Sequence, residues 1–413
     1  MHIIVVAIGS EGDINPMIEI GAALKNHGHQ VDFLASGYFE NKIAEAGLNP
    51  HCLGDRKQYE EVVKNPEIWH PRKGFQAIWK SLKDYVPQQY ELIESLLKPE
   101  KSILVATSLG FAARLVAEKH QVKQATVHLS PSVILSAERP PHMPGLKLPG
   151  ILPYMLRKWV VDAIDRHALD PILKPDMNRI RENLELQPID KIMSTWMHST
   201  DQVILAFPSW YAPAASDWPK NHVFTGFPLA KSKAGAELSD GLRRYLADGA
   251  EPILFTAGSA MAHGNKFFET ARKAAAALGK RAVFVNRFDR SLNRENSDSL
   301  YYSEYEPFDL LFPKVAAVVH HGGIGTSAQA MKAATPQLVV PFAHDQFDNA
   351  ERLTNLGIAE QVRSMNVEEW QNKLNRLLGD SSIRSSCQDK SGLIERMGDS
   401  ADRAACAIES LAT

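Results

Sequence analysis

The chain has 413 residues, of which 44% are hydrophobic and 23% are charged. This composition is typical of globular proteins and excludes a disordered or fibrous chain, while the length favours two domains over one core. The 46 Lys and Arg residues nearly balance the 48 Asp and Glu residues, leaving a formal charge of -2 and no basic surface for a nucleic acid.

The chain opens with a short apolar run, His2–Ile8, which ends at Gly9. No basic region precedes this run, so we interpret it as a buried strand and not as a signal peptide. No apolar run is long enough to span a bilayer. The cysteines, Cys52, Cys387 and Cys406, are odd in number and far apart, which favours a reducing compartment. We therefore expect a cytoplasmic protein.

Strand-like runs and helical patterns then alternate along the chain. Helical spacing over Pro16–His27 ends at Gly28, a strand-like run covers Val31–Ala35, and a second helical pattern covers Tyr38–Ala46. The same alternation continues through Ser102–Ala106, Ala112–Lys119, Ala125–His128 and Gln202–Ala206. Continuous apolar strands separated by helices predict a doubly wound parallel sheet.

A long insertion interrupts this alternation between Pro131 and Asp201. Its first part, Ser130–Gly145, follows a predicted strand and is broken by prolines, so we expect it to form part of a binding surface. The residues assigned to acceptor binding are Ser130, Val133, Leu135 and Met143. Their apolar character favours a lipidic or polycyclic acceptor.

A second set of alternating elements starts at Ile253–Ala257, after a polar segment, Gly226–Leu238, that contains Pro and Gly. The expected fold class is α/β, with two Rossmann-like doubly wound domains that face each other across a cleft. We assign residues 1–230 to an acceptor-binding domain, 231–398 to a nucleotide-sugar-binding domain, and 399–413 to a helix that packs back on the N-terminal domain.

The most informative segment, His320–Arg352, reads HHGGIGTSAQAMKAATPQLVVPFAHDQFDNAER. A strand, a Gly-rich turn and a helix that begins near Thr326 form a phosphate-binding arrangement, to which a histidine adds a charge-assisted donor. Asp345 and Gln346 follow the next strand and suit sugar hydroxyls at the carboxyl edge of the sheet. The GxGxxG pattern of dinucleotide oxidoreductases is absent.

These residues resemble the glycosyltransferase family 1 signature, HHGGxGT followed by PxxxDQxxNAxR. Near the start, GSEGDINP resembles the bacterial GSxGDxxP subgroup, and most closely the rhamnosyltransferases of rhamnolipid synthesis. The motifs TWMHS, FPSWYAP, DWP and TGFPL extend the resemblance over nearly the whole chain. The resemblance implies a GT-B fold and an inverting hexosyltransferase that moves glucose or rhamnose from a UDP- or dTDP-sugar to a hydroxyl. The nucleotide sugar is then a co-substrate, and no cofactor is expected.

The resemblance also implies roles for individual residues. Those assigned to the diphosphate, ribose and sugar of the donor are Gly258, Ser259, His321, Gly323, Gly325, Thr326, Gln329, Asp345 and Gln346. Plant members of the family carry Glu at the position of Gln329, so the ribose contact differs here. The nucleobase would pass Tyr305, Pro307 and Phe308.

The catalytic base should lie in the loop after the first strand, Gly9–Pro16, because inversion requires a group that takes the proton from the acceptor hydroxyl. Many family members have His in this loop, whereas this chain offers Asp13, with Glu11 as a second choice. The competing interpretation is that Asp13 only caps a helix beginning at Asn15 and Pro16.

No metal is expected, because the chain has no DxD triplet and His27 and His29 lack ligand spacing with other residues. Two alternatives stay open: an epimerase or hydrolase acting on the same donor, and a non-catalytic auxiliary protein. Peripheral association with a membrane or with a partner enzyme is also open.

Overall fold

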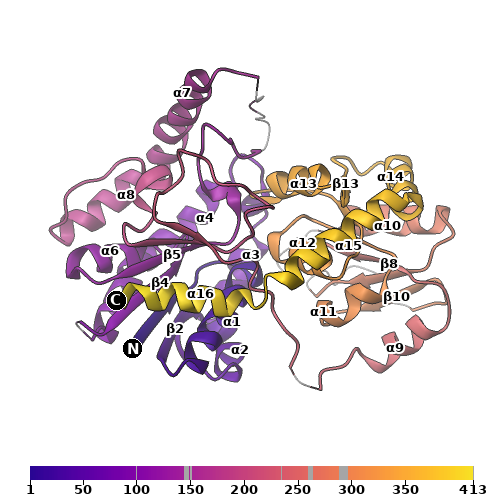
Figure 1. Cartoon of the computed structure of the whole chain (residues 1–413), viewed down its shortest axis with the longest axis horizontal. Coiled ribbons are helices and arrows are strands. Elements are labelled where there is room, and N and C mark those ends of the chain that lie inside the picture. Colours follow the sequence, from indigo (N-terminus) through magenta and orange to yellow (C-terminus); the bar gives the residue numbers. More distant parts are fainter. Residues whose placement is uncertain are drawn as a thin grey trace. The chain divides into compact units, whose positions relative to one another are not determined.

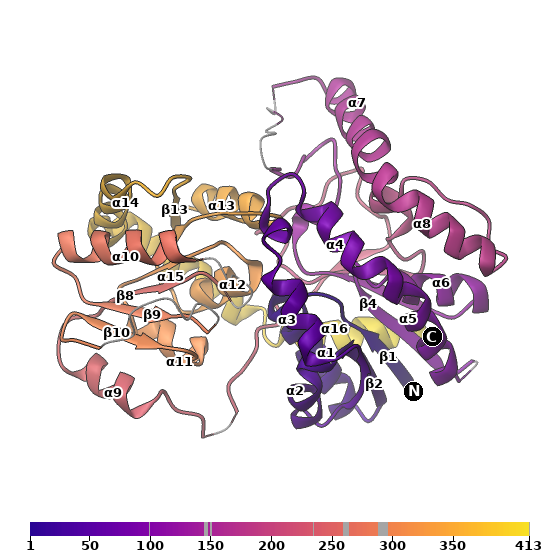
Figure 2. The same ribbon diagram turned by 180° about the vertical axis from the view of Figure 1, so that it is seen from behind.

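The computed structural model describes residues 1–98, 100–143, 148, 151–233, 235–258, 264–287 and 296–412. They form two compact units, of which unit 1 comprises Met1–Pro228 with Asp399–Thr413 and unit 2 comprises Leu229–Gly398 (Figures 1 and 2). Each unit contains a parallel sheet flanked by helices, which confirms the predicted α/β fold with two Rossmann-like domains. None of the described helices combines the length and apolarity that crossing a membrane requires.

Unit 1 is built on a seven-stranded sheet with the order β3-β2-β1-β4-β5-β6-β7, in which every described pair is parallel. Its strands are β1 (His2–Val6), β2 (Gln30–Ser36), β3 (Asn49–Leu53), β4 (Ser102–Thr107), β5 (Gln124–His128), β6 (Gln202–Leu205) and β7 (His222–Phe224). Its helices are α1 (Glu11–Asn26), α2 (Glu40–Glu45), α3 (Arg56–Lys64), α4 (Gly74–Leu82), α5 (Val86–Leu96), α6 (Phe111–His120), α7 (Tyr154–Ile164), α8 (Asp170–Asn183) and α16 (Ser400–Glu409).

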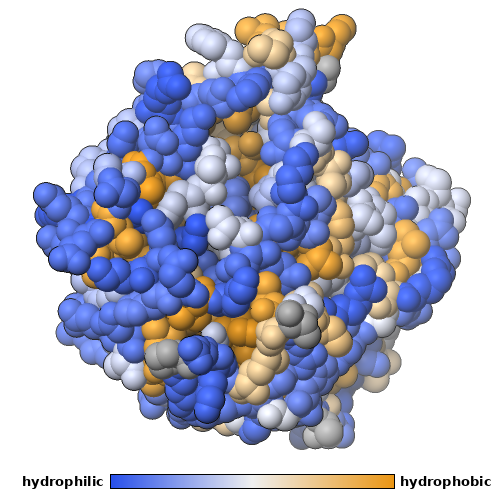
Figure 3. All heavy atoms as spheres, turned by 60° about the vertical axis from the view of Figure 1, so that its left-hand side comes forward, coloured by the Kyte–Doolittle hydropathy of each residue, from blue (hydrophilic) through white to orange (hydrophobic). Residues whose placement is uncertain are grey.

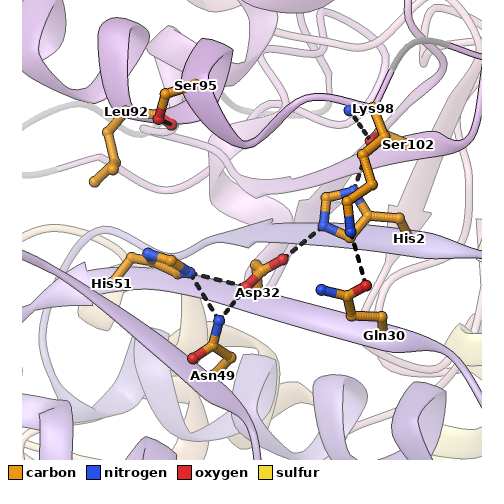
Figure 4. Close-up of polar contacts among 9 residues, drawn as sticks. All are labelled: His2, Gln30, Asp32, Asn49, His51, Leu92, Ser95, Lys98 and Ser102. Carbon is orange, nitrogen blue, oxygen red and sulfur yellow. Dashed lines mark hydrogen bonds and ion pairs between the residues drawn. The ribbon is translucent and has the colours of Figure 1, made fainter.

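The apolar runs expected as strands become the central strands of this sheet, because β1 and β4 are buried over their whole length. Polar side chains fill the amino-terminal edge of the same strands (Figure 4). His2 lies 2.7 Å from Ser102 and 2.6 Å from Asp32, and His51 lies 2.8 Å from Asp32. Buried polar groups are stable only when they are paired, and this network pairs them.

The sequence-based start of α1 is wrong. Ser10 caps the helix, which begins at Glu11 and carries Pro16 in its interior. Asp13 is therefore not the cap but the third helical residue. Its side chain accepts from the Ser10 backbone while Ser10 accepts from the first turn, as in a capping box. This reciprocal capping starts the helix several residues before the proline.

The C-terminal segment belongs to unit 1, where α16 packs along α1 (Figures 1 and 2). Five residues of α16 are buried, namely Ser400, Ala401, Ala404, Ala405 and Ile408. The small side chains on this face allow close approach of the two helices.

Unit 2 is built on a six-stranded sheet with the order β10-β9-β8-β11-β12-β13. Its strands are β8 (Ile253–Thr256), β9 (Ala282–Val285), β10 (Leu300–Ser303), β11 (Ala317–His320), β12 (Gln337–Val339) and β13 (Ala359–Gln361). Its helices are α9 (Asp240–Ala247), α10 (Asn265–Ala277), α11 (Phe308–Leu311), α12 (Ile324–Lys332), α13 (Gln346–Asn355), α14 (Val367–Gly379) and α15 (Ser381–Arg396). The helix expected near Thr326 begins two residues earlier, at Ile324.

Candidate functional site

The order of the strands in unit 2 changes direction between β8 and β11, which are neighbours in the sheet but not in the chain. Open α/β sheets bind ligands at this point, beyond the carboxyl ends of the strands. Gly258 follows β8 and His321 follows β11, so topology brings two predicted donor residues together. Ser259, the neighbour of Gly258 in the prediction, lies outside the described residues.

The imidazole of His321 lies between two glycines. A Cβ on Gly258 would come within 2.5 Å of Cε1 of His321, and a Cβ on Gly323 within 2.4 Å of Nε2. Gly258 also has φ +91, a conformation that residues with a side chain rarely adopt. Both positions therefore require glycine for a local reason, which is to leave space for the ring.

Burial lowers the pKa of His321 to about 4, so the ring is neutral near neutral pH. This differs from the charge-assisted donor expected from the sequence. Within the described part of the chain, the buried Nδ1 of His321 has no hydrogen-bond partner. A buried polar atom without a partner is costly, and a hydrogen bond from a ligand at this position would satisfy it.

The preceding residue, His320, holds the turn in place. The backbone N–H of Gly322 donates to Nδ1 of His320 at 3.1 Å, and Nε2 lies 2.9 Å from Oε1 of Gln337. Nδ1 is therefore the acceptor, and Nε2–H donates to Gln337. Burial, together with the neighbouring His321, lowers the pKa of His320 to about 3. His320 thus shapes the turn.

Helix α12 begins directly after this turn. Gly323 is its N-cap and provides no side chain to satisfy the first N–H groups. Such amides, with the helix dipole, form an anion-binding site. Gly325 lies in the first turn, where an added Cβ would meet open space, and Thr326 is half-buried. The space beside Gly325 and Thr326 is therefore open to a ligand.

The predicted sugar-binding pair has two different structural roles. The side-chain oxygen of Gln346 accepts hydrogen bonds from the backbone N–H groups of Phe342 at 2.8 Å and Ala343 at 3.0 Å. Gln346 is buried, so it shapes the loop before α13 and leaves only its amide nitrogen for a ligand. Asp345 is half-buried at the N-cap of α13, where its Oδ2 accepts from Asn349 at 2.8 Å.

Asn349 was not among the residues predicted for the site. Its amide nitrogen also donates to the backbone carbonyl of Gly322, at 2.9 Å, and the residue is fully buried. Asn349 therefore connects the turn after β11 to Asp345. The DQxxNAxR pattern contained this signal, because Asp345 and Asn349 are four residues apart and share a helix face.

Some of the residues predicted to bind the ribose and the nucleobase already make contacts within the protein, which leaves less of their surface for a ligand. The side-chain amide of Gln329 donates to the backbone carbonyl of Ala230 at 2.8 Å. Phe308 stacks on Phe312 with ring centroids 4.6 Å apart, so one face of its ring is used in packing. Pro307 precedes α11 as its N-cap. Tyr305, whose exposed fraction is 64%, is the more accessible aromatic ring.

In unit 1 the direction of the strand order changes between β1 and β4. The loop after β1 places Asp13 at this point. Its Oδ2 lies 2.8 Å from the backbone N of Ser10 and 3.2 Å from the Ser10 hydroxyl. A Cβ on Gly9 would meet this oxygen at 2.2 Å, so the glycine leaves space for the carboxylate. Burial raises the pKa of Asp13, and the hydrogen bonds from Ser10 offset part of the rise.

Beside this loop lies a polar chain that the sequence did not predict. The hydroxyl of Ser108, after β4, is 2.9 Å from Nδ1 of His128, whose Nε2 is 2.8 Å from Nδ1 of His198. Burial lowers the pKa of both rings, that of His198 to about 4. His128, the last residue of β5, therefore places a neutral ring at the carboxyl edge of the unit 1 sheet, in contact with the neutral ring of His198.

The residues predicted for the acceptor lie in the segment after β5 and differ in their burial. Ser130 is buried, whereas Val133 and Leu135 are half-buried and pack against the core of unit 1. Met143 is half-buried at the end of the described part of this segment. Core packing thus accounts for part of what the sequence assigned to binding.

Asp217, from the DWP motif, fixes this segment. Its carboxylate accepts from the Ser136 hydroxyl at 2.7 Å, from the backbone N of Ala137 at 2.7 Å and from that of Glu138 at 3.1 Å. Arg157 of α7 donates to the backbone carbonyl of Glu138 at 2.8 Å. The segment after β5 and helix α7 are therefore tied together.

Comparison with known proteins finds a related domain family for each of the two units. Residues 3–137 match the glycosyltransferase family 28 N-terminal domain, and residues 282–392 match the erythromycin biosynthesis protein CIII-like C-terminal domain. The sequence motifs had suggested family 1, whereas the matching N-terminal model is that of family 28. Both matches support a chain composed of GT-B glycosyltransferase domains.

Individual relatives agree with these matches. A sterol 3-beta-glucosyltransferase of Arabidopsis thaliana is 25% identical over 94% of this chain, which spans 62% of that protein's length. O-mycaminosyltylonolide 6-deoxyallosyltransferase of Streptomyces fradiae is 26% identical, with 87% of this chain and 85% of the relative covered. The crystal structure of the glycotransferase of kitacinnamycin superposes with a TM-score of 0.78 at 18% identity, with 100% of this chain and 99% of the other covered, and so shows the same fold.

Proposed function

Since the chain combines the N- and C-terminal domains of GT-B glycosyltransferases, we propose that it is an inverting glycosyltransferase. It transfers a hexose, glucose or rhamnose, from a UDP- or dTDP-sugar to a hydroxyl of an apolar or lipidic acceptor. The observation that carries this proposal is the buried, unpartnered Nδ1 of His321 beside the uncapped N-terminus of α12. Both features suit an anion such as a diphosphate.

In the proposed reaction, the helix N-terminus and the neutral imidazole of His321 bind the diphosphate and stabilise its charge as it departs. Asp345 hydrogen-bonds sugar hydroxyls, and Asn349 holds it in position. Asp13 takes the proton from the acceptor hydroxyl, which attacks the anomeric carbon. The raised pKa of Asp13 suits this role, because a base with a pKa closer to the working pH transfers protons more efficiently. No metal ion is required by this scheme.

Relatives support the donor and acceptor classes. Two solved structures of similar fold, glycosyltransferase VinC with DTDP and spinosyn rhamnosyltransferase SpnG with thymidine diphosphate, bind a thymidine nucleotide. The named relatives act on a sterol and on a mycaminosyltylonolide. A dTDP-sugar and a polycyclic or lipidic acceptor are therefore the first combination to test. Free cysteines at all three positions agree with the cytoplasmic location that belongs to this proposal.

The surface of α7 provides a place for an apolar acceptor. On this helix, Met155, Leu156 and Trp159 have exposed fractions of 72%, 45% and 68%, and Ile151, three residues before the helix, has 93%. Figure 3 shows apolar side chains at the top of the face, over this helix. Since Arg157 ties α7 to the segment after β5, we propose that the acceptor passes along this helix. Exposed apolar patches of this kind commonly mark binding surfaces.

The donor site can be tested with Gly325→Ala. The substitution adds one methyl group to open space and replaces glycine by the best helix former, so it preserves or raises stability. A methyl group directed at the diphosphate would nevertheless block its approach. The matched control is Gly379→Ala, at the end of α14, where an added Cβ also meets open space.

The experiment measures the shift in melting temperature with UDP, dTDP, GDP and their sugar conjugates. We expect one nucleotide to stabilise wild type and Gly379→Ala, but not Gly325→Ala or His321→Ala. Equal stabilisation of all four proteins would overturn the donor site. Incubation of the stabilising donor with apolar alcohols should then give a glycoside. Release of the nucleotide without a glycoside would favour a hydrolase, and binding without turnover an auxiliary protein.

A further inference from the structure

Five side chains that can bind metal ions come together where α16 packs against the turn between α1 and β2. His27 and His29 flank the turn between α1 and β2, and Asp402, Cys406 and Glu409 lie on α16. The spacing of four and then three residues places these last side chains on one face of the helix. The sequence spacing of the two histidines had not indicated a metal site, because the side chains that they contact lie more than 370 residues away.

The contacts between these side chains are short. Nδ1 of His27 lies 2.9 Å from Oε1 of Glu409, and Nε2 of His29 lies 2.6 Å from the same oxygen. Nε2 of His27 lies 2.7 Å from Oδ1 of Asp402. One ligand atom each from His27, Cys406 and Glu409 lie within 4.8 Å of one another. The cluster therefore already has its nitrogen, sulfur and oxygen donors gathered around one position.

This set of donors suits zinc. Tetrahedral Zn²⁺ sites have bonds of about 2.0–2.3 Å to His, Cys and carboxylate ligands, which places the donor atoms about 3.5 Å apart. Because His27 and Cys406 are exposed and Glu409 is half-buried, their side chains have room to rotate toward that separation. Thiolate and imidazole ligands favour zinc and similar transition metals over magnesium and calcium. The charges also balance, since one thiolate and one carboxylate neutralise a divalent ion.

Asp402 provides the supporting contact that such sites commonly have. A histidine that binds a metal through one ring nitrogen usually donates its other N–H to a carboxylate, which fixes the orientation of the ring. His27 directs Nδ1 toward Glu409 and Nε2 toward Asp402. Its two nitrogens thus have separate partners before any ion binds.

We propose that His27, Cys406 and Glu409 bind a divalent transition-metal ion of the zinc type. Asp402 is the positioning residue for His27, and His29 contacts the carboxylate of Glu409. The ion fastens α16 to the turn between α1 and β2 and so stabilises unit 1. Its role is structural and is separate from the glycosyl transfer proposed above, because none of its ligands belongs to the donor site or to the loop of Asp13.

Cobalt(II) provides a direct test, since it replaces zinc and is visible by absorption spectroscopy. The metal-free full chain is titrated with Co²⁺. We expect the visible bands of a tetrahedral site together with a near-ultraviolet charge-transfer band from a cobalt–thiolate bond. Cys406→Ser should abolish the charge-transfer band, whereas Cys52→Ser, which removes another exposed cysteine of unit 1, should retain it. A wild-type spectrum without this band, or its loss only in Cys52→Ser, overturns the proposal.

Thermal unfolding provides an independent readout. Zn²⁺ should raise the melting temperature of wild type and Cys52→Ser relative to the metal-free form of each protein, and Mg²⁺ should not. The shift should disappear in Cys406→Ser. Asp402→Asn should still bind zinc but about 10- to 100-fold more weakly. Because each protein is compared with its own metal-free form, an intrinsic change in stability does not obscure the result. Equal zinc shifts in wild type and Cys406→Ser contradict the proposed site.

Discussion

The side-chain amide of Asn349 donates to the backbone carbonyl of Gly322 at 2.9 Å, across 27 residues of sequence. The same nitrogen donates to Oδ2 of Asp345 at 2.8 Å. One buried side chain thus links the turn proposed to bind the diphosphate with the carboxylate proposed to bind the sugar. We therefore expect the spacing between these two parts of the proposed donor site to depend on Asn349.

Asn349→Leu keeps the size of the side chain and removes both donors. We expect the free energy of unfolding to fall by about 1–3 kcal/mol, because a buried carbonyl loses its partner. Affinity for the donor nucleotide should fall by more than tenfold. Asn372→Leu, at an exposed position of α14, is the control. Chemical denaturation and nucleotide titration measure the two effects, and unchanged affinity would refute the linking role.

Asp13→Asn tests the proposed base. Asn keeps an oxygen that accepts from the Ser10 backbone, so α1 should stay capped and donor affinity should be unchanged. The value of kcat should fall by about 100- to 10,000-fold, as is typical when a general base is lost. Ser10→Ala is the comparison, because it removes the cap, at a cost of about 1 kcal/mol, but keeps the carboxylate. Similar kcat values in wild type and Asp13→Asn would assign the residue to capping alone.

The pH dependence of kcat/KM follows from the raised pKa of Asp13. A base must be deprotonated to act, so kcat/KM should fall as the pH drops through the raised pKa. In contrast, nucleotide binding should not weaken between pH 8 and pH 6 through His321, because the pKa of its ring is lowered to about 4 and its charge does not change in that range. Loss of binding as the pH rises through about 6.5 would show that an imidazolium is needed.

Buried histidines should make the protein sensitive to acid. The residues whose pKa burial lowers are His128, His198, His320 and His321. Between the ordinary value of 6.5 and the lowered values, the unfolded chain binds more protons than the folded one. The free energy of unfolding should therefore decrease as the pH falls from 6.5 toward 4. Denaturation at a series of pH values, with histidine NMR signals as a second probe, measures this, and constant stability across that range would contradict it.

If α7 binds the acceptor, the effect of substitutions on its apolar surface should depend on which acceptor is used. Met155 and Trp159 are exposed, so replacing both with Ser should leave the melting temperature unchanged. KM for long-chain or polycyclic acceptors should rise several-fold, because less apolar surface is buried on binding. KM for a short, water-soluble alcohol and the affinity for the donor should stay the same. An equal change for both classes of acceptor would remove α7 from acceptor binding.

The sequence alone determined the two-domain α/β fold and the place of the Gly-rich turn that we propose binds the donor. Both features depend on residues that are close together in the sequence. Buried parallel strands appear as continuous apolar runs. A Gly-rich turn between a strand and a helix appears as a short run of consecutive residues. The glycines beside His321 belong to the same motif or to the end of a neighbouring strand. Helix starts were less certain, as α1 shows, because a capping box and a proline give competing signals over a few residues.

Only the tertiary structure decided which polar groups meet. It gave Gln346 a role in shaping its loop and joined Asn349 to Gly322. It also brought Glu409 to His27, a partner 382 residues away. Such pairs depend on how helices pack against the sheet and leave no periodic pattern in a single sequence. Their energies come from burial and from satisfied hydrogen bonds, which exist only once distant segments are in contact.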